Sequence, residues 1–262
     1  MNSSDSDVVL IGSGIMSSTL GVLLKRLNPK LRITLYEVAD QLSAEASDGW
    51  HNAGTGHAGI CELSYTPHPE PDGSVNVTKA IDIFQEFEAS LQFWAQCVAD
   101  GVLKDTTNFI NPVPHLSFVR TDEQIPYLRA RYEGMSAHHF FAPMEFTSDP
   151  AKISEWAPLL TEGRGDESIA ATKMNGGSDV NFGEISRGLC AWLAQQEGCK
   201  VLPGHRVTDL TRRDDGKSWN VTAERRFDGQ SFTSSTDFIF VGAGGGSILL
   251  LQNAGLPEAR GL

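Results

Sequence analysis

The sequence predicts an α/β fold in which a parallel sheet is extended by an antiparallel meander, and three observations predict it. Residues 7–39 follow the order strand, glycine-rich turn, helix, strand, which is typical of a βαβ unit. Residues 205–241 contain short strand-like runs separated by Asp215-Gly216 and Asp228-Gly229, dipeptides that favour hairpin turns. Residues 237–241 form a further run, expected to be a buried strand, that leads directly into "GAGGG".

Each element of the βαβ unit follows from its residues. Residues 8–11 and 33–36 are continuous apolar runs, as expected for strands covered on both faces of a parallel sheet. Residues 15–27 predict a helix in which Leu20, Leu23, Leu24 and Leu27 share one face. The dipeptide Asn28-Pro29 is expected to end this helix.

The turn between the first strand and the helix predicts a dinucleotide site. Gly12 permits a sharp turn, Gly14 lets a pyrophosphate approach the helix N-terminus, and Ser17 is small enough for the third glycine position. Glu37 stands at the end of the second strand, where a carboxylate suits two ribose hydroxyls and repels a 2′-phosphate. The cofactor is therefore expected to be FAD or NAD rather than NADP.

The middle of the chain predicts further helices and strands. Residues 78–100 have the apolar spacing of a long amphipathic helix, and residues 111–120 are expected to be a loop that runs into a strand. The stretch "NGGSDVNFG" is expected to be a glycine-rich turn before a helix over residues 184–196, which Gly198 closes.

Composition restricts the partners and the compartment. The 262 residues include 21 Lys and Arg against 33 Asp and Glu, a formal net charge of −12, which argues against nucleic acid as a partner. The four cysteines, Cys61, Cys97, Cys190 and Cys199, form no CxxC pair and are expected to be free thiols. The sequence has no signal-peptide pattern and no apolar run of about 20 residues, so we expect a cytoplasmic protein.

The order of the elements favours FAD over NAD. A first βαβ unit, a long excursion, a meander and a returning strand with "VGAGGG" are typical of FAD-binding Rossmann domains, whereas an NAD dehydrogenase would continue with further βα units. The alternative is that "GAGGG" opens a second nucleotide site for NAD(P)H.

The stretch "WHNAGTGHAG" at residues 50–59 allows three interpretations. His51 and His57 have no carboxylate or cysteine at a ligand spacing, so no metal site is predicted. No strand and helix frame the stretch, which disfavours a phosphate cradle. A loop beside a flavin ring is the interpretation that remains.

With these residues described, the sequence resembles the malate:quinone oxidoreductases, which are FAD enzymes of the amino-acid-oxidase-like class. The resemblance lies in "VVLIGSGIMSSTLGVLL", "NAGTGHAGICELSYTP", "FINPVPHLSFV", "HHFFAPMEFTSDPAKISEWAPL", "GSDVNFGEISR" and "FVGAGGGSILLLQNAGLPEA". It implies oxidation of (S)-malate to oxaloacetate in the tricarboxylic acid cycle, with electrons passed to a membrane quinone.

The resemblance also implies an architecture. We expect an α/β fold with an FAD-binding Rossmann-type domain, a parallel sheet and an antiparallel meander, plus part of an α+β substrate domain. Residues 1–76 would form the FAD-binding βαβ unit and flavin-side loop, 77–172 a partial substrate domain, and 173–262 the return to the FAD-binding domain. Family members are about twice as long, so the C-terminal half of the family is expected to be absent.

Site residues are expected from the chemistry and from the resemblance. His57 and His115 are the candidate bases for the C2 hydroxyl proton and Arg164 is the candidate carboxylate clamp, all three expected in loops, where each could equally be only a structural hydrogen-bonding group. The residues expected to contact FAD are Gly12, Gly14, Ser17, Glu37, Asn52, Gly54, Thr55, Gly56, Val207, Gly242 and Gly244.

Two other functions stay open. The chain could be a related flavoprotein that oxidises another 2-hydroxy acid, such as 2-hydroxyglutarate, or an amine. It could instead be an inactive, truncated FAD-binding fragment. Peripheral contact with the inner face of the cytoplasmic membrane is compatible with each of the enzyme interpretations.

Overall fold

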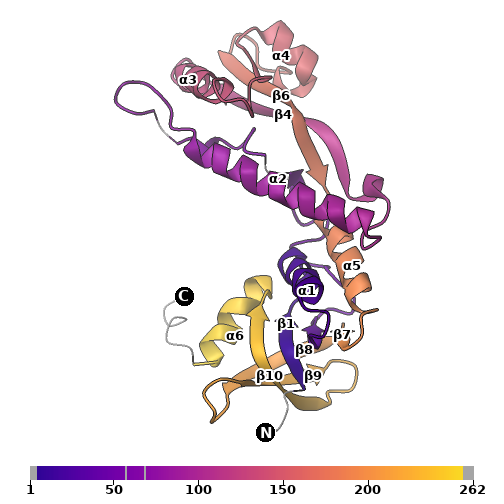
Figure 1. Ribbon diagram of the computed structural model, residues 1–262. Helices are drawn as coiled ribbons and strands as arrows, with labels where there is room; N and C mark the ends of the chain where they lie inside the picture. The colour runs from indigo at the N-terminus through magenta and orange to yellow at the C-terminus, as the bar shows by residue number, and fades with distance from the viewer. Residues whose placement is uncertain (1–4, 57, 68, 256–262) are drawn as a thin grey trace. The chain divides into compact units, whose positions relative to one another are not determined.

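The computed structural model describes residues 5–56, 58–67 and 69–255, and the chain forms two compact units (Figure 1). The first unit comprises Met1–Gly54, Asp100–Phe109 and Asn181–Leu262, and the second comprises Thr55–Ala99 and Ile110–Val180. The predicted division at residues 76 and 172 differs from these boundaries. The reason is strand pairing: β3 (Thr55–Gly56) and the whole of β6 (Ile169–Val180) belong to one sheet.

The first unit is built on a six-stranded sheet of order β7-β2-β1-β10-β9-β8. Its parallel part contains β7 (Cys199–Leu202), β2 (Ile33–Tyr36), β1 (Ser6–Ile11) and the end of β10 (Ser231–Val241). Its antiparallel part contains the start of β10, β9 (Trp219–Arg225) and β8 (His205–Arg212). The predicted βαβ unit and meander are therefore both present.

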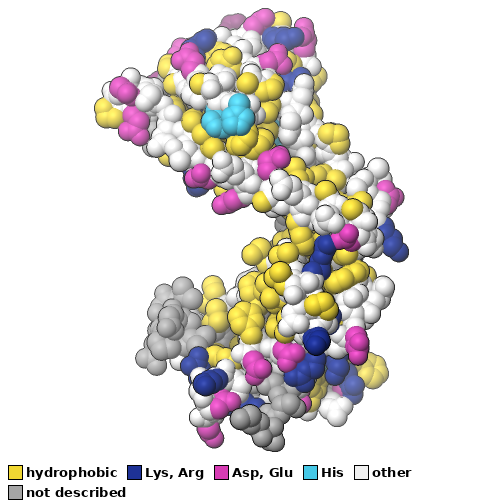
Figure 2. All heavy atoms as spheres, viewed as in Figure 1, with side chains coloured by type: hydrophobic (Ala, Val, Ile, Leu, Met, Phe, Trp, Pro, Cys, Tyr) yellow, Lys and Arg dark blue, Asp and Glu magenta, His cyan; other side chains and the backbone are white. Residues whose placement is uncertain are grey.

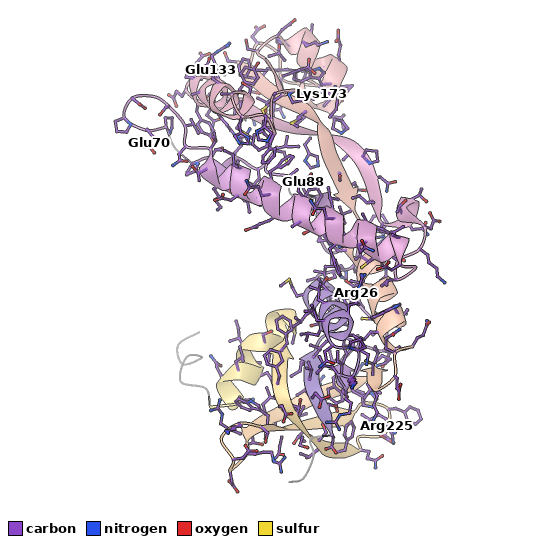
Figure 3. All side chains as sticks on the ribbon, in the orientation of Figure 1. Arg26, Glu70, Glu88, Glu133, Lys173 and Arg225 are labelled. Carbon is purple, nitrogen blue, oxygen red and sulfur yellow. The ribbon has the colours of Figure 1, made fainter. Side chains whose placement is uncertain are left out.

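The two predicted hairpin turns form at the expected glycines. Gly216 and Gly229 have φ values of +65° and +69°, in the left-handed region that favours glycine. Asp215 accepts hydrogen bonds from the amides of Lys217 and Ser218, and these bonds, with one from the Ser218 hydroxyl, lower its pKa to about 2. In the second turn Arg225, which is labelled in Figure 3, donates a hydrogen bond to the Asp228 carboxylate. This bond lowers the pKa of Asp228 to about 2.

The last strand differs from its prediction. Residues 237–241 are not a separate buried strand but the end of β10, which first pairs with β9 and then with β1. Phe238 is 49% exposed, although its register partner on β1, Val8, is buried. On the face of the sheet that carries Val8 and Phe238, side chains of β1 are therefore buried while part of β10 stays exposed to solvent.

Helix α1 (Ile15–Leu27) begins and ends as predicted, but only part of the predicted face is correct: Leu20 and Leu24 pack against the core, and Leu23 and Leu27 do not. Its buried residues are Ser17, Ser18, Gly21, Val22 and Lys25, whereas Leu23 and Leu27 are 40% and 81% exposed. Small residues face the sheet because α1 packs closely: a Cβ at Gly21 would lie 2.9 Å from side-chain atoms of both Leu10 and Leu193.

Helix α5 (Phe182–Leu193) packs beside α1 and is shorter than predicted. Asn181 caps its N-terminus by accepting a hydrogen bond from the Glu184 amide. The helix ends at the cap residue Ala194, and Gly198, with φ +74°, serves the following turn rather than the cap. On the other face of the sheet, α6 (Ser247–Asn253) follows the short 3₁₀ segment η4 (Gly244–Gly246) and places Leu250 in the core with Val9 and Ile11.

The second unit contains a sheet of order β3-β6-β4, with β5 (Glu145–Thr147) also paired to β6. Strand β4 (Ile110–Arg120) already begins at residue 110, so the loop predicted at its start is wrong. The glycine-rich turn predicted from residue 175 is also wrong in part, because Asn175 to Val180 belong to β6. Antiparallel pairing with β4 across Ser178 and Gly177 keeps this stretch extended.

Helices surround this second sheet. They are α2 (Thr78–Ala99), which matches the predicted long helix, α3 (Ile125–Ser136) and α4 (Pro150–Trp156). Three 3₁₀ segments, η1 (Leu63–Tyr65), η2 (Thr106–Asn108) and η3 (Pro158–Leu160), lie in the connections. Lys173 of β6, labelled in Figure 3, lies with its ammonium 5.5 Å from the centroid of the Trp156 ring of α4.

The cysteines agree with the prediction from composition. All four cysteines are free, and burial raises the pKa of the Cys190 thiol to about 12. Among the helices in the described part of the chain, none combines the length and apolar character needed to cross a bilayer.

Candidate nucleotide site

The predicted glycine positions meet at the carboxyl ends of β1 and β10. Gly12 has φ +93°, and a Cβ at this position would overlap the carbonyl oxygen of Gly242. The Gly242 amide in turn donates a hydrogen bond of 2.8 Å to the Ile11 carbonyl. Two segments from opposite ends of the sequence therefore approach so closely that only glycine fits at position 12.

Ser17 completes this arrangement. Its side chain is fully buried in the first turn of α1, and within the described residues its hydroxyl has no hydrogen-bond partner. A Cβ at Gly242 would overlap this same hydroxyl oxygen. A buried hydroxyl costs free energy unless it is hydrogen-bonded, so the unpartnered Ser17 oxygen is an unfavourable feature of this close packing.

Glu37 lies where the prediction places it, at the end of β2, and is buried. Its carboxylate accepts hydrogen bonds from the amide and hydroxyl of Ser13, at 2.8 and 2.7 Å, and from the Ala39 amide at 2.8 Å. The acidic side chain thus holds the glycine-rich turn against the end of β2, in addition to any contact with a ribose.

Two serines of this site were not predicted. Ser47 accepts a hydrogen bond from the Ile15 amide at 3.0 Å and so caps α1 from a distant loop, while Gly14 offers no side-chain cap. Ser43, with φ +57°, donates two hydrogen bonds to Ser13, from its amide to the hydroxyl and from its hydroxyl to the carbonyl. The sequence shows only that small residues follow the second strand. It does not indicate that Ser43 and Ser47 bind Ser13 and Ile15.

The other two predicted nucleotide contacts also belong to the first unit. Val207 lies on β8, two residues after His205, whose amide donates to the Glu37 carbonyl, so this strand begins beside the end of β2. Gly244 begins η4 with φ +52°, and a Cβ there would meet nothing within 4 Å. Its requirement for glycine is therefore conformational rather than steric.

The stretch "WHNAGTGHAG" divides between the two units. Asn52 donates to the carbonyls of Ala46 and Asp48 and accepts from the Gly54 amide, which fixes the end of the loop in the first unit. Thr55 and Gly56 pair with β6 in the second unit. His57, the first candidate base, lies outside the described residues. In the described part of the chain, no group of three or more His, Cys, Asp or Glu side chains is arranged to hold a metal.

His115 is a strand residue and not a loop residue as predicted. It follows a bulge in β4, is 8% exposed, and its Nε2 lies 3.3 Å from the Ser178 carbonyl oxygen. Its ring lies over Gly177, where a Cβ would overlap it. Gly56 also pairs with Ser178, so two of the predicted site residues meet at this one position of β6.

Arg164 lies in a loop, as predicted, but is held by local contacts. Its Nε donates to the Leu160 carbonyl at 2.6 Å, its Nη1 contacts Glu167 at 3.2 Å, and its guanidinium lies 5.3 Å from the Phe118 ring centroid. Because side chains alternate along a strand, Phe118 and His115 leave opposite faces of β4. The sheet therefore separates Arg164 from His115.

Arg131 is a buried cation that the sequence did not reveal. Its side chain on α3 is fully buried, and it donates to the Ile60 carbonyl and the Thr66 hydroxyl, both at 2.7 Å. These acceptors are neutral, and burial lowers the pKa of the guanidinium. Arg131 ties α3 to the segment that follows the glycine-rich loop. An arginine within a helical stretch carries no sequence signal for such a role.

The fold defines a class of protein: two-unit α/β proteins whose first unit begins with a βαβ motif of the dinucleotide-binding type. The chain superimposes on glycine oxidase from Geobacillus kaustophilus with a TM-score of 0.66 and 17% identity, over 97% of this chain and 59% of that one. It superimposes on L-α-glycerophosphate oxidase from Mycoplasma pneumoniae with a TM-score of 0.61 and 18% identity, over 90% and 53%. The predicted fold class is confirmed.

The chain belongs to the malate:quinone oxidoreductase family, because the family model of that description matches residues 4–262. A probable malate:quinone oxidoreductase from Micrococcus luteus is 52% identical over 97% of this chain and 51% of its own length. One from Bradyrhizobium diazoefficiens is 47% identical over 98% and 50%. The resemblance noted from the motifs is thus confirmed, and the chain spans about half the length of these curated relatives.

Proposed function

We propose that this chain supplies the FAD-binding half of an enzyme that oxidises (S)-malate to oxaloacetate and passes the electrons to a quinone. The observation that carries the proposal is membership of the malate:quinone oxidoreductase family across residues 4–262. FAD as the cofactor is supported by one structural neighbour, the glycerophosphate oxidase from Mycoplasma pneumoniae, whose structure has FAD bound.

The residues of the first unit fit FAD. The pyrophosphate would lie at the N-terminus of α1, where the N-cap residue Gly14 has no side chain and the first backbone amides of the helix favour an anion. Glu37 would accept hydrogen bonds from the adenosine ribose, and Val207 would lie near the adenine. When bound, FAD supplies a two-electron acceptor for the hydride that leaves C2 of the hydroxy acid.

The protein must also remove the C2 hydroxyl proton and hold two carboxylates. His57 and His115 remain the candidate bases, and His115 is the one whose surroundings are described. Its burial beside Ser178 excludes water from one side of the ring. Arg164 remains a candidate clamp only if it acts separately from His115, since the two side chains lie on opposite faces of the sheet.

The test uses two proteins: this chain, and this chain fused to the unmatched half of the Micrococcus luteus relative. We expect FAD in both, and malate-driven reduction of a quinone-like dye in the fusion. A fused, folded, FAD-containing protein that reduces the dye with 2-hydroxyglutarate and not with malate would reject malate as substrate. Sedimentation with vesicles tests peripheral membrane contact, which the proposed quinone acceptor requires.

A further inference from the structure

We propose that Arg131 is a positioning residue for the proposed oxidation of malate. It holds the segment of residues 60–66, which follows the glycine-rich loop, against the face of β4 that carries His115. The inference rests on the proposed function, because it gives Arg131 a part in that reaction. Its support comes from the burial of the cation, from its contacts, and from the places of the two candidate bases along the contacted segments.

Arg131 differs from the other cations of the second unit. The unit has seven Lys and Arg residues, which are Lys79, Arg120, Arg129, Arg131, Lys152, Arg164 and Lys173. In the described structure Arg131 is the one among them that is buried. On the visible face of this unit in Figure 2, Lys and Arg side chains lie at the surface near Asp and Glu. A cation buried among neutral partners is costly, so a contribution to stability alone does not explain it.

The guanidinium of Arg131 joins two segments that are far apart in the sequence. Its Nη2 donates to the Ile60 carbonyl and its Nε to the Thr66 hydroxyl, both at 2.7 Å, at the two ends of the held segment. Its Nη1 donates to the Ser117 hydroxyl of β4 at 3.5 Å, and this hydroxyl donates to the Cys61 carbonyl at 2.8 Å. One planar group with donors in several directions therefore fixes the segment to the strand, which the compact ammonium of a lysine cannot do.

The contact with Ser117 reaches the face of β4 that carries a candidate base. Side chains alternate along a strand, so Ser117 and His115 leave the same face. Both side chains are buried. Helix α3 covers this face, because its Leu128 packs in one cluster with Val119, two positions further along β4. Arg131 is therefore anchored on the same side of the strand as His115.

The other end of the network adjoins the glycine-rich loop. His57, the other candidate base, precedes Ile60 by three positions in the sequence. Gly59 has φ +67° and lies so close to α2 that a Cβ would overlap the Ala80 carbonyl oxygen. Helix α2 thus holds Gly59, and Arg131 holds the next residue. Because catalytic rates depend steeply on geometry, a shift of this segment would slow removal of the proton by either histidine.

The test measures kcat and KM for malate, per bound FAD, in the fusion to the Micrococcus luteus second half. Arg131→Lys keeps the charge but not the planar fork, so kcat should fall by about 10-fold to 100-fold while KM changes by less than about threefold. A purely structural role would lower the yield of folded, FAD-containing protein and leave kcat per FAD unchanged. Arg129→Lys is the matched control. Arg129 is exposed on the same helix, 4.3 Å from the Phe146 ring centroid, and its substitution should change neither value.

Ser117→Ala is a second variant that removes no charge. It deletes the hydroxyl that joins Arg131 to the Cys61 carbonyl, and kcat should fall by about threefold to tenfold. Amide hydrogen exchange of this chain alone gives a readout that needs no activity. The Thr66 amide donates to the Leu63 carbonyl, and it should exchange at least about tenfold faster in Arg131→Lys.

The outcomes separate the positioning role from the proposed function. A folded, FAD-containing, unaltered fusion that does not oxidise malate would reject the proposed function and, with it, the part of Arg131 in that reaction. An active fusion in which Arg131→Lys and Ser117→Ala leave kcat per FAD unchanged would overturn the positioning role alone, even if both variants are less stable.

Discussion

The buried hydroxyl of Ser17 on α1 occupies the space that a side chain at Gly242, the residue after β10, would need. This relationship joins the first and last strands of the first unit at the N-terminus of one helix. Because Gly242 also donates to Ile11, the two strand ends are fixed relative to α1 by steric fit and by a hydrogen bond. The candidate nucleotide site is therefore bounded by segments from early and late in the sequence.

Gly242→Ala is expected to lower the free energy of unfolding by about 1–3 kcal/mol, because the added methyl group overlaps Ser17 Oγ in a packed region. Gly245→Ala is the control: a Cβ there meets nothing within 4 Å. Chemical denaturation of both variants measures the difference. Equal stability of the two variants would show that the close approach of Gly242 to α1 is not present in solution.

Glu37→Gln is expected to destabilise the first unit by about 1–3 kcal/mol. Both carboxylate oxygens of Glu37 accept hydrogen bonds, and the substitution replaces one of these oxygens with an NH2 group that cannot accept. Asp40→Asn is the control, since the Asp40 side chain is 82% exposed and lies three residues further on. If both variants unfold at the same denaturant concentration, the carboxylate does not hold the glycine-rich turn.

The Asp215 turn predicts a dependence of stability on pH. The pKa of Asp215 is about 2 in the folded chain and 3.8 for the ordinary group, so the folded state binds its proton less readily. Its contribution is present above pH 4 and is lost as the pH falls through 2. Asp215→Asn should therefore lower the melting temperature at pH 7 and have a smaller effect near pH 2. Asp214→Asn, at the adjacent exposed residue, is the matched control. An equal effect of Asp215→Asn at pH 7 and near pH 2 would contradict the prediction.

Arg131→Met is expected to destabilise the second unit by about 2–4 kcal/mol, because it leaves the Ile60 carbonyl and the Thr66 hydroxyl without their donor in a buried place. Arg131→Lys should recover only part of the loss, since an ammonium cannot span the same acceptors. Arg129→Met, on the exposed side of the same helix, is the control. If Arg131→Met leaves the hydrogen-exchange protection of the Ile60 to Thr66 segment unchanged, the guanidinium does not hold that segment.

The sequence predicted the elements whose signals are local. The βαβ unit, the hairpin glycines Gly216 and Gly229, and the long helix α2 depend on residues within a few positions of each other. The Gly12 and Glu37 positions were predictable because both belong to one spaced motif.

Features that depend on pairing between distant segments were not predictable. His115 was predicted to lie in a loop, but pairing with β6 extends the strand from Ile110 to Arg120. The buried face of α1 was predicted only in part. Leu20 and Leu24 pack against the core, but close packing on Leu10 and Leu193 brings Gly21 and serines to the sheet instead of Leu23 and Leu27. Ser47 and Arg131 act on segments 32 and 65 residues away, beyond any sequence period.

Titration of the chain with FAD, followed by quenching of flavin fluorescence, tests the central claim most directly. We predict saturation at one FAD per chain. Gly242→Ala and Glu37→Gln should weaken binding by at least about tenfold, a loss of about 1.4 kcal/mol, while Gly245→Ala binds as the unaltered chain does. A folded chain that binds no FAD, or that binds it equally well with Gly242→Ala, would contradict the claim that these residues form the flavin site.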